Sequence, residues 1–241
     1  AEMKAVKDGD GYKLSGTKMF VQYANSVDYF VVSARTSGDN LSEEGISLFL
    51  VDAKSSGITM DAIQVVARDK QYEVIFKDVK VDGNALIGEV DKGFEILTKV
   101  IKIGAVAKSG EMVGGGQFVI DLTVNYSIDR EQFGKPIGKF QAIQHHCANM
   151  LMDLSGSRYM AYKAAWFIDE KNTNELFIAS AKGFASDAYR RICKNGHQVG
   201  GGSAFMEEQE MQLYSRRAKA GEVMYGDATY HRKMAAKAIG L

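Results

Sequence analysis

YSIDREQFGKPIGKFQAIQHHCANM, residues 126–150, marks the corner between two long helical patterns, and this corner decides the fold. Pro136, the only proline, follows the turn-like stretch FGK and sits where a helix would begin. Its fixed φ and missing N–H carry no penalty at that position. After it, Ile143, Cys147, Met150, Leu151, Leu154, Ala161, Ala165 and Ile168 recur at three- and four-residue steps. This spacing predicts one buried face of a helix.

The chain on both sides of this corner continues the helical period from residue 91 onward. Phe177, Ala181, Phe184, Ala188 and Ile192 form a second apolar series. The predicted helices cover residues 91–130, 137–170, 174–195, 207–220 and 227–239. Long neighbouring helices with short links favour an up-and-down four-helix bundle, which we assign to residues 89–241.

Residues 1–88 have a different period, that of strands. The predicted strands are YKLSGTKMFV (12–21), VDYFVVSAR (27–35), ISLFLVD (46–52) and YEVIFKDVKV (72–81). DGDG at 8–11 predicts a hairpin turn, and SGDNLSEEG at 37–45 predicts a surface loop. The fold class is therefore α+β with two domains, an antiparallel β-barrel or sandwich followed by the helical bundle.

Composition excludes several functional classes. With 46% hydrophobic residues in 241, the chain can bury a large core, and its 30 basic and 30 acidic residues are interspersed. We therefore expect neither nucleic acid nor a membrane as a partner, and no stretch is long enough to span a bilayer. Cys147 and Cys193 fit free thiols of a cytoplasmic protein. The first residue is not Met, so we expect a fragment or a processed subunit.

Two glycine-rich stretches and two histidines are candidate ligand sites. MVGGGQF (112–118) and VGGGSAF (199–205) lack both the P-loop lysine and the Rossmann spacing. The first lies within a helical pattern, where glycine costs ~1 kcal/mol, so close helix packing is favoured over a ligand. The second is interpreted as a turn between helices, with an anion site as the alternative. The adjacent His145 and His146 point to different sides of a helix, so no metal site is expected.

One further stretch carries possible chemistry. In DREQFGKPIGKFQ, residues 129–141, Arg130 could clamp a pyrophosphate through bidentate hydrogen bonds. Taken alone, the stretch is as well explained by a surface arginine beside a helix corner.

Residues 126–150 closely resemble the long-helix corner of the acyl-CoA dehydrogenases, flavoenzymes that desaturate acyl thioesters. Residues 11–35 resemble the first strands of that family's β-domain, and residues 74–97 its exit into the C-terminal helices. HQVGGGSAF (197–205) is similar to the family's Gln-x-x-Gly-Gly turn, and residues 216–236 to its final helix pair. The resemblance covers nearly the whole chain, but the family's N-terminal helical domain has no counterpart in it.

The resemblance implies FAD as the cofactor. Arg130 and Phe133 would touch its diphosphate and adenosine, with Gln141 nearby. Gln198, Gly201 and Gly202 would approach from a neighbouring subunit, which implies a homodimer or homotetramer that shares the site. Phe20 would pack on the flavin ring and Gln22 would hydrogen-bond to it. The helix-start backbone at Gly226 would also pass close to the flavin.

The resemblance also implies an oxidoreductase acting on the Cα–Cβ bond of an acyl-CoA, with an electron-transferring flavoprotein as partner. A carboxylate removes the α-proton while the β-hydrogen leaves as hydride to the flavin, or the reverse reaction reduces an enoyl-CoA. The two family positions for that carboxylate hold Tyr225 and Gly104, and neither is a base at neutral pH. The positions that hold CoA in many members are Lys102 and Ala105, with Lys108 as another possible phosphate ligand.

Three residues remain as weak catalytic candidates. Asp227 is better explained as a helix cap, and Glu111 as a solvated carboxylate. Tyr225 could donate a proton to an enolate-like carbon during enoyl-CoA reduction.

Two alternatives to an active dehydrogenase stay open. A non-catalytic subunit of the same fold would explain the missing base, and a flavin monooxygenase or acyl-CoA oxidase would keep the architecture with other chemistry. The enzyme is favoured because the residues expected to face FAD are intact.

Overall fold

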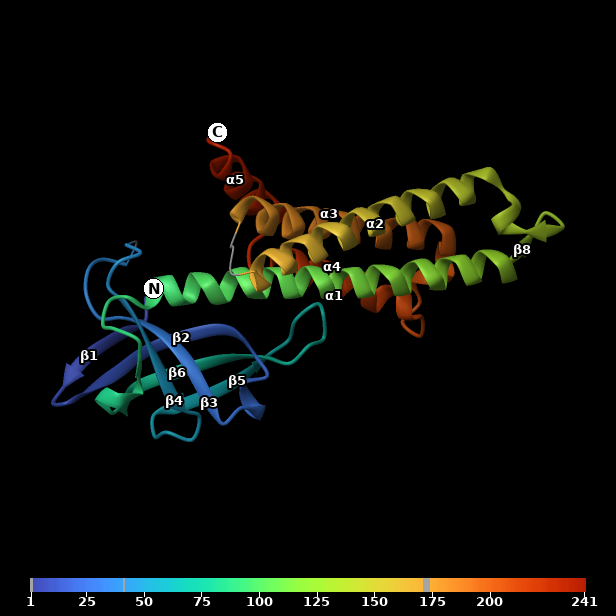
Figure 1. Ribbon diagram of the computed structural model, residues 1–241. Coiled ribbons are helices and arrows are strands. Elements are labelled where there is room, and N and C mark those ends of the chain that lie inside the picture. Colours follow the sequence, from blue (N-terminus) through green and yellow to red (C-terminus); the bar gives the residue numbers. More distant parts are fainter. Residues whose placement is uncertain (1, 41, 171–173) are drawn as a thin grey trace. The chain divides into compact units, whose positions relative to one another are not determined.

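The computed structural model describes residues 2–40, 42–170 and 174–241, and the chain forms two compact units, residues 1–100 and 101–241. The first unit contains a β-sheet and the start of the long helix α1 (Gly93–Asp129), and the second contains the remaining helices (Figure 1). Each unit has its own hydrophobic core. The domain boundary between residues 88 and 89 stays a prediction.

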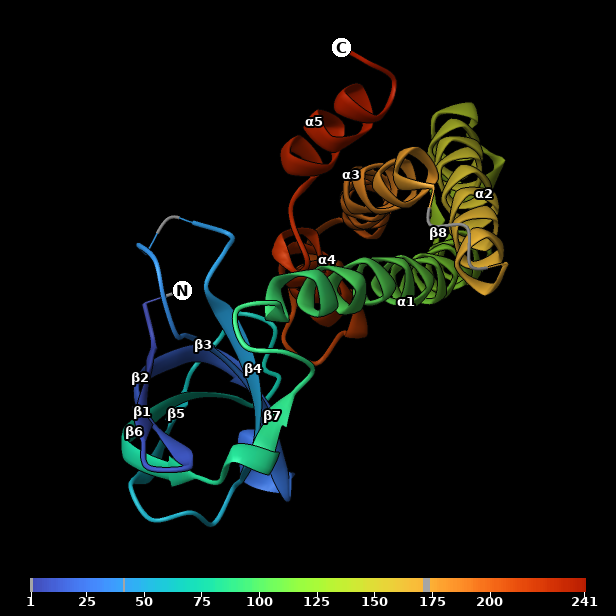
Figure 2. The ribbon, with the colours of Figure 1, turned by 60° about the vertical axis from the view of Figure 1, so that its left-hand side comes forward.

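The first unit is built on one seven-stranded sheet with the order β5-β6-β2-β1-β3-β4-β7. Its strands are β1 (Lys4–Asp8), β2 (Gly11–Gln22), β3 (Tyr29–Arg35), β4 (Ile46–Asp52), β5 (Ile58–Ile63), β6 (Gln71–Val81) and β7 (Leu86–Ile87). Figure 2 shows that the sheet curls around its core. The predicted barrel-like β-domain is therefore confirmed, together with the hairpin turn at residues 8–11, where Asp8 pairs with Gly11.

One strand pair corrects the expectation of a purely antiparallel sheet. Strand β1 pairs with its hairpin partner β2 on one side and with β3 on the other, and the β1–β3 pairing is parallel. Strand β2 runs opposite to β1, and after β2 the chain turns back, so β3 runs in the same direction as β1. Two strands of the same direction then become neighbours, and Lys4 pairs with Arg35.

The core of the sheet follows strand alternation. In β3, Phe30 and Val32 are buried while Tyr29 and Val31 are exposed, as a strand with one solvated face requires. Arg35 is only 6% exposed, and its guanidinium donates to the carbonyls of Ser37, Ser42 and Glu44 at 3.2, 2.7 and 2.8 Å. These bonds hold the predicted surface loop 37–45, in which residue 41 lies outside the described residues.

The second unit is a helical bundle, as predicted. Its further helices are α2 (Gln141–Asp169), α3 (Glu175–Gly200), α4 (Glu210–Val223) and α5 (Ala228–Ala238). The long helices α1, α2 and α3 run alongside one another, and α3 packs against α2, α4 and α5 (Figures 1 and 2). Helix α5 corresponds to the helix predicted at residues 227–239.

The buried face of α2 is rotated slightly from the predicted one. Leu151 is 53% exposed and Ala165 is also exposed, whereas Ser157 and Ala164 are buried beside the correctly predicted Met150, Leu154 and Ala161. A straight helix turns 100° per residue, so the steps 150, 154, 157, 161 and 164 keep to one face.

The corner between α1 and α2 is more elaborate than a helix start. Phe133 and Gly134 turn a small hairpin between β8 (Glu131–Gln132) and β9 (Lys135–Pro136). A 3-10 turn over Ile137–Lys139 follows, and α2 begins only at Gln141. Pro136 therefore lies in a short strand and not at the first turn of a helix, which corrects the prediction. Its missing N–H is tolerated in so short a hairpin.

The glycine turn also begins later than predicted. Helix α3 continues past residue 195 to Gly200, and a 3-10 turn over Gly201–Phe205 follows. Gly201 adopts φ +58°, a left-handed conformation that favours glycine.

The glycine-rich part of α1 is explained by packing, as predicted. A Cβ at Gly115 would lie 2.3 Å from the Tyr189 hydroxyl, while a Cβ at Gly114 would meet nothing within 4 Å. We expect Gly115→Ala to lower the free energy of unfolding by about 1–3 kcal/mol through overpacking. The neighbouring Gly114→Ala should instead raise it by up to ~1 kcal/mol, because alanine favours the helix. Urea denaturation measures both, and equal effects of the two variants would contradict the packing explanation.

Candidate functional site

A cavity of about 720 Å³ lies between the α1–α2 corner and the glycine turn. Arg130 and Phe133 line it from the corner, and Gly201 and Gly202 line it from the turn after α3. The structure thus brings four of the predicted cofactor residues together within one chain. The expectation that the glycine turn reaches the cofactor from a neighbouring subunit stays a prediction.

Three features of this cavity are open to a ligand. The Arg130 side chain is exposed and forms no hydrogen bond or ion pair with any residue in 2–40, 42–170 or 174–241. Phe133 is 91% exposed at φ +55°, a conformation that is unfavourable for a side chain with a Cβ. Added Cβ atoms at Gly201 and Gly202 would meet nothing within 4 Å, so neighbouring atoms do not explain these glycines. An unpaired cation, an exposed ring and an open glycine backbone suit a ligand that carries an anionic group and a flat ring.

Two of the predicted cofactor residues lie beside this cavity but do not line it. Gln141 is the first residue of α2, and Gln198 lies in the last turn of α3. Both are exposed. Neither has a contact in the described structure that supports the predicted role.

The predicted flavin-facing residues of the sheet lie at an irregular part of β2. The pairing of β2 with β6 shifts between Lys18 and Val21, and Phe20 there is 59% exposed at φ +59°. The amide of Gln22 donates to Asp69 at 3.1 Å. The Gln22 side chain is therefore already engaged, whereas the ring of Phe20 is open to contact.

Gly104 and Tyr225, which occupy the two family positions for the catalytic carboxylate, lie against each other. A Cβ at Gly104 in α1 would lie 2.6 Å from the ring of Tyr225, which belongs to the connection between α4 and α5. Glycine at 104 is thus the residue that makes room for the tyrosine. Tyr225 is 38% exposed, and no residue in the described part of the chain hydrogen-bonds to its phenol oxygen.

The other candidate acids are occupied. The Asp227 carboxylate accepts a hydrogen bond from the Tyr230 backbone at 2.7 Å and caps α5. Glu111 forms an ion pair with Lys108 at 2.5 Å, and its side chain is 64% exposed. Both therefore have the structural roles that the sequence favoured. The predicted CoA positions are also engaged in the protein itself: Lys102 pairs with Glu175, and Ala105 is buried.

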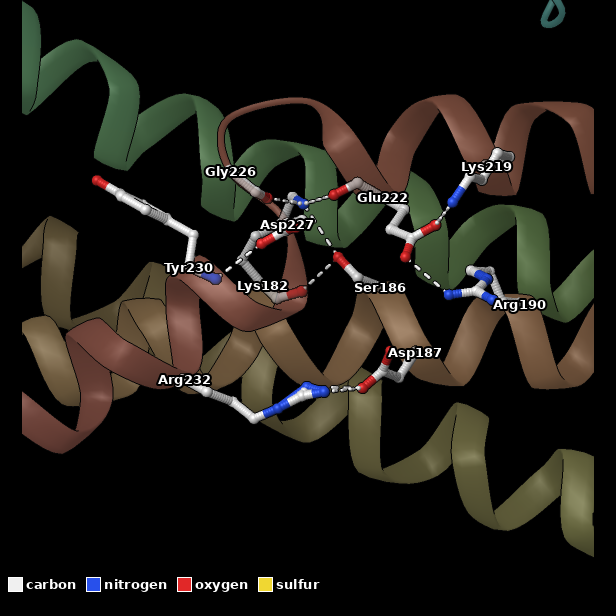
Figure 3. Close-up of polar contacts among 10 residues, drawn as sticks. All are labelled: Lys182, Ser186, Asp187, Arg190, Lys219, Glu222, Gly226, Asp227, Tyr230 and Arg232. Carbon is white, nitrogen blue, oxygen red and sulfur yellow. Dashed lines mark hydrogen bonds and ion pairs between the residues drawn. The ribbon is translucent and has the colours of Figure 1, made fainter.

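Lys182 is a residue that sequence reasoning missed. It lies in α3 at 0% exposure, and its ammonium donates to Ser186 Oγ and to the carbonyls of Glu222 and Gly226 at 3.0, 3.1 and 2.8 Å (Figure 3). Burial lowers its pKa to about 8, with Lys108 contributing in the same direction and Glu222 and Asp227 opposing. The available signal was a lysine and a serine four residues apart beside an apolar helix face.

Lys182 makes stability depend on pH in a defined window. In the folded protein Lys182 loses its proton near pH 8, whereas in the unfolded chain it does so near the ordinary value of 10.5. Between pH 8 and pH 10.5 the unfolded state therefore binds more protons than the folded state. The unfolding free energy of the wild type, minus that of Lys182→Met, should therefore rise as pH rises through this window. Chemical denaturation at several pH values measures it. Lys194→Met, an exposed lysine of the same helix, is the control, and a constant difference for Lys182→Met would contradict the expectation.

The two adjacent histidines and the two cysteines do not line the cavity. His146 Nδ1 lies 3.1 Å from Asn195 Oδ1, and His145 is exposed. Cys147 and Cys193 are both free, and burial raises the pKa of Cys193 to about 12. The described residues contain no cluster of three or more metal-ligating side chains. Among them there is also no helix that is both long and apolar enough to cross a membrane.

Two family models match the chain. The model "Acyl-CoA dehydrogenase, middle domain" matches residues 1–79, and "Acyl-CoA dehydrogenase, C-terminal domain" matches residues 91–240.

Individual relatives agree with these models. "Probable acyl-CoA dehydrogenase YngJ" of Bacillus subtilis is 31% identical over 241 residues, which cover 99% of this chain and 63% of that protein. "Caffeyl-CoA reductase-Etf complex subunit CarC" of Acetobacterium woodii is 32% identical over 225 residues, which cover 92% and 59%. The structure of butyryl-CoA dehydrogenase from Megasphaera elsdenii matches with a TM-score of 0.95 at 29% identity, covering 99% and 63%. The chain thus spans about three fifths of the length of these proteins.

Proposed function

The chain belongs to the acyl-CoA dehydrogenase family, and from this membership and the site we propose that it serves an FAD-dependent oxidoreductase acting on the Cα–Cβ bond of an acyl-CoA. The observation that carries the proposal is the cavity in which Arg130 and Phe133 meet Gly201 and Gly202. The Arg130 side chain has no hydrogen-bond or ion-pair partner among the described residues, and a non-catalytic subunit would not need a free cation there.

The cavity residues fit the diphosphate and adenosine of FAD. The Arg130 guanidinium would pair with a diphosphate oxygen, and the glycine backbone would allow close approach. The exposed ring of Phe133 would stack on a base. When bound, the flavin supplies two-electron redox chemistry at the Cα–Cβ bond. Phe20, at its irregular strand position, is the residue we assign to the flavin ring.

Reduction of an enoyl-CoA is the direction that the chain's own residues favour. Residues 104 and 225 offer no carboxylate to accept an α-proton, and Asp227 and Glu111 are engaged elsewhere. The phenol of Tyr225 has no hydrogen-bond partner among the described residues, so its proton is available to a carbon that gains charge during reduction. The relative CarC is named as a subunit of a caffeyl-CoA reductase–Etf complex, which favours an electron-transferring flavoprotein as the electron source here.

The separation of the two parts of the site supports a homo-oligomer, dimer or tetramer. Gly104 lies near the start of the second unit and Arg130 directly after the end of α1. The helix between them is about 38 Å long at 1.5 Å per residue, longer than an extended dinucleotide. One cofactor cannot contact both Gly104 and Arg130 in one chain, so we infer that a site using Tyr225 takes its diphosphate half from a second copy. Free thiols are in keeping with a cytoplasmic location.

The alternative is a non-catalytic subunit that assembles with an active partner, and the absence of a carboxylate at residues 104 and 225 favours it. An absorption spectrum of the purified protein in excess FAD separates the two. We expect a bound flavin whose reduced form is reoxidised by an enoyl-CoA. A protein that binds no flavin would overturn the proposal. No observation favours the monooxygenase or oxidase chemistry.

Replacing Arg130 tests the cavity directly. We expect Arg130→Gln to weaken FAD binding by about 10–100-fold, the loss of one charge-assisted hydrogen bond of about 1.5–3 kcal/mol. Flavin fluorescence titration measures the dissociation constant. Arg232→Gln is the matched control, because Arg232 is engaged by Asp187 at 3.0 Å and does not line the cavity. Equal affinity of Arg130→Gln and wild type would show that this cavity does not hold the diphosphate.

A further inference from the structure

The connection between α4 and α5 is held by two buried basic side chains. Lys182 of α3 donates to the carbonyls of Glu222 and Gly226, and His231 of α5 contacts the carbonyl of Tyr225 at 2.9 Å. Lys182 is 0% and His231 is 3% exposed. Three carbonyls of one short segment are thus fixed by side chains that approach from two different helices.

This segment needs such fixing because its backbone is unfavourable. Tyr225 adopts φ +55° and Gly226 follows at φ +94°. A left-handed conformation costs a residue with a Cβ about 1–2 kcal/mol, and it persists only where the surroundings determine it. It is this conformation that places the Tyr225 ring against Gly104.

The number of donors requires that Lys182 be protonated. An ammonium has three N–H groups, and Lys182 has three acceptors, Ser186 Oγ and the carbonyls of Glu222 and Gly226. Ser186 cannot donate in return, because its hydroxyl donates to the Lys182 carbonyl at 2.8 Å. A neutral amine, with two N–H groups, would leave one buried oxygen without a donor.

His231 completes the arrangement in its neutral form. A carbonyl only accepts hydrogen bonds, so Nε2 carries the proton that Tyr225 receives. Its Nδ1 is buried and has no partner among the described residues, and burial lowers the pKa of this histidine. The nearby ammonium of Lys182 acts in the same direction.

We propose that protonated Lys182 is the positioning residue for Tyr225. It anchors the backbone on both sides of this tyrosine and so holds the phenol ring against Gly104. The inference rests on the proposed function only for what Tyr225 does in turnover, and the position of the ring can be measured without cofactor or substrate.

The other charged groups around Lys182 are engaged elsewhere and do not take over its hydrogen bonds to the carbonyls of Glu222 and Gly226. The Glu222 carboxylate is shared by Arg190 and Lys219 at 2.7 Å each, and Arg232 pairs with Asp187 (Figure 3). Asp227 caps α5, and Lys108, from α1, is paired with Glu111. With the neutral His231, these are the charged and titratable groups that bear on Lys182 from α1, α3, α4 and α5. Since the pKa of Lys182 is about 8, the segment should loosen as pH rises above that value.

Fluorine NMR of the full chain labelled with 3-fluorotyrosine tests the proposal. The resonance of residue 225 is identified as the one lost in Tyr225→Phe. In Lys182→Met we expect it to move to the position it has in the urea-unfolded protein. In the wild type it should make the same movement with a midpoint near pH 8, where Lys182 loses its proton. This titration needs no variant and covers the case in which Lys182→Met does not fold.

Arg191→Met is the matched control. It removes a cation from the same helix, one that pairs with Asp153 and does not touch the segment. The resonance of residue 225 should stay in place in this variant. An unmoved resonance in folded Lys182→Met, or a wild-type resonance that stays in place as pH rises through 8, would overturn the proposal. Because no turnover is measured, a failure here is distinct from a failure of the proposed oxidoreductase activity.

Discussion

In Tyr225→Phe, enoyl-CoA reduction falls by about 10²–10⁴-fold while FAD stays bound. This is the range by which a positioned acid accelerates proton transfer. Phenylalanine keeps the ring that packs against Gly104 and removes only the hydroxyl. The loss should therefore be in the chemical step and not in folding or cofactor affinity. Single-turnover reoxidation of the reduced flavin by an enoyl-CoA separates these contributions.

Tyr230→Phe provides the control for this experiment. It makes the same chemical change five residues along the chain, in a side chain that is 51% exposed. Its rate should equal that of the wild type. Unchanged turnover in Tyr225→Phe would remove the tyrosine from the mechanism and would strengthen the alternative in which this chain is a non-catalytic subunit.

The strands that sequence predicted are those with a strong apolar pattern. β3 and β4 carry continuous or alternating apolar residues and were located closely. β1 was missed because Ala5 is the one buried residue in a strand of otherwise exposed side chains, and β5 has no fully buried residue. Their strand character comes from hydrogen bonding to a neighbour, which no local pattern records. The parallel contact of β1 with β3 likewise depends on the order of strands in the sheet.

The site was predictable where a motif and its chemistry lie in one stretch of sequence. Arg130 and the glycine turn were found separately, but only folding shows that they face one cavity. The same holds for Gly104 and Tyr225, which are far apart in sequence and meet because the α4–α5 connection packs against α1. Lys182 was missed because a buried lysine is recognised by its acceptors. Two of these are distant in sequence, the carbonyl of Glu222 in the last turn of α4 and that of Gly226 in the α4–α5 connection.

Gly104→Ala should act through Tyr225. The added methyl group would lie 2.6 Å from the phenol ring, so the ring must move. A displacement of about 1 Å at a reacting group can cost 10²-fold in rate. We therefore expect enoyl-CoA reduction to fall by about 10–100-fold in Gly104→Ala. Gly110→Ala, at a position of the same helix where an added Cβ meets nothing within 4 Å, should leave the rate unchanged.

The double variant Gly104→Ala/Tyr225→Phe decides whether the glycine works through the phenol. If Gly104 matters only because it seats Tyr225, the rate of the double variant should be close to that of Tyr225→Phe alone, since the proton donor is already gone. Residues in contact commonly show such non-additivity, whereas independent effects multiply. A double variant slower by the product of the two single effects would mean that residue 104 contacts the substrate or the flavin directly. Glycine at this position would then serve access to the site and not the placement of the tyrosine.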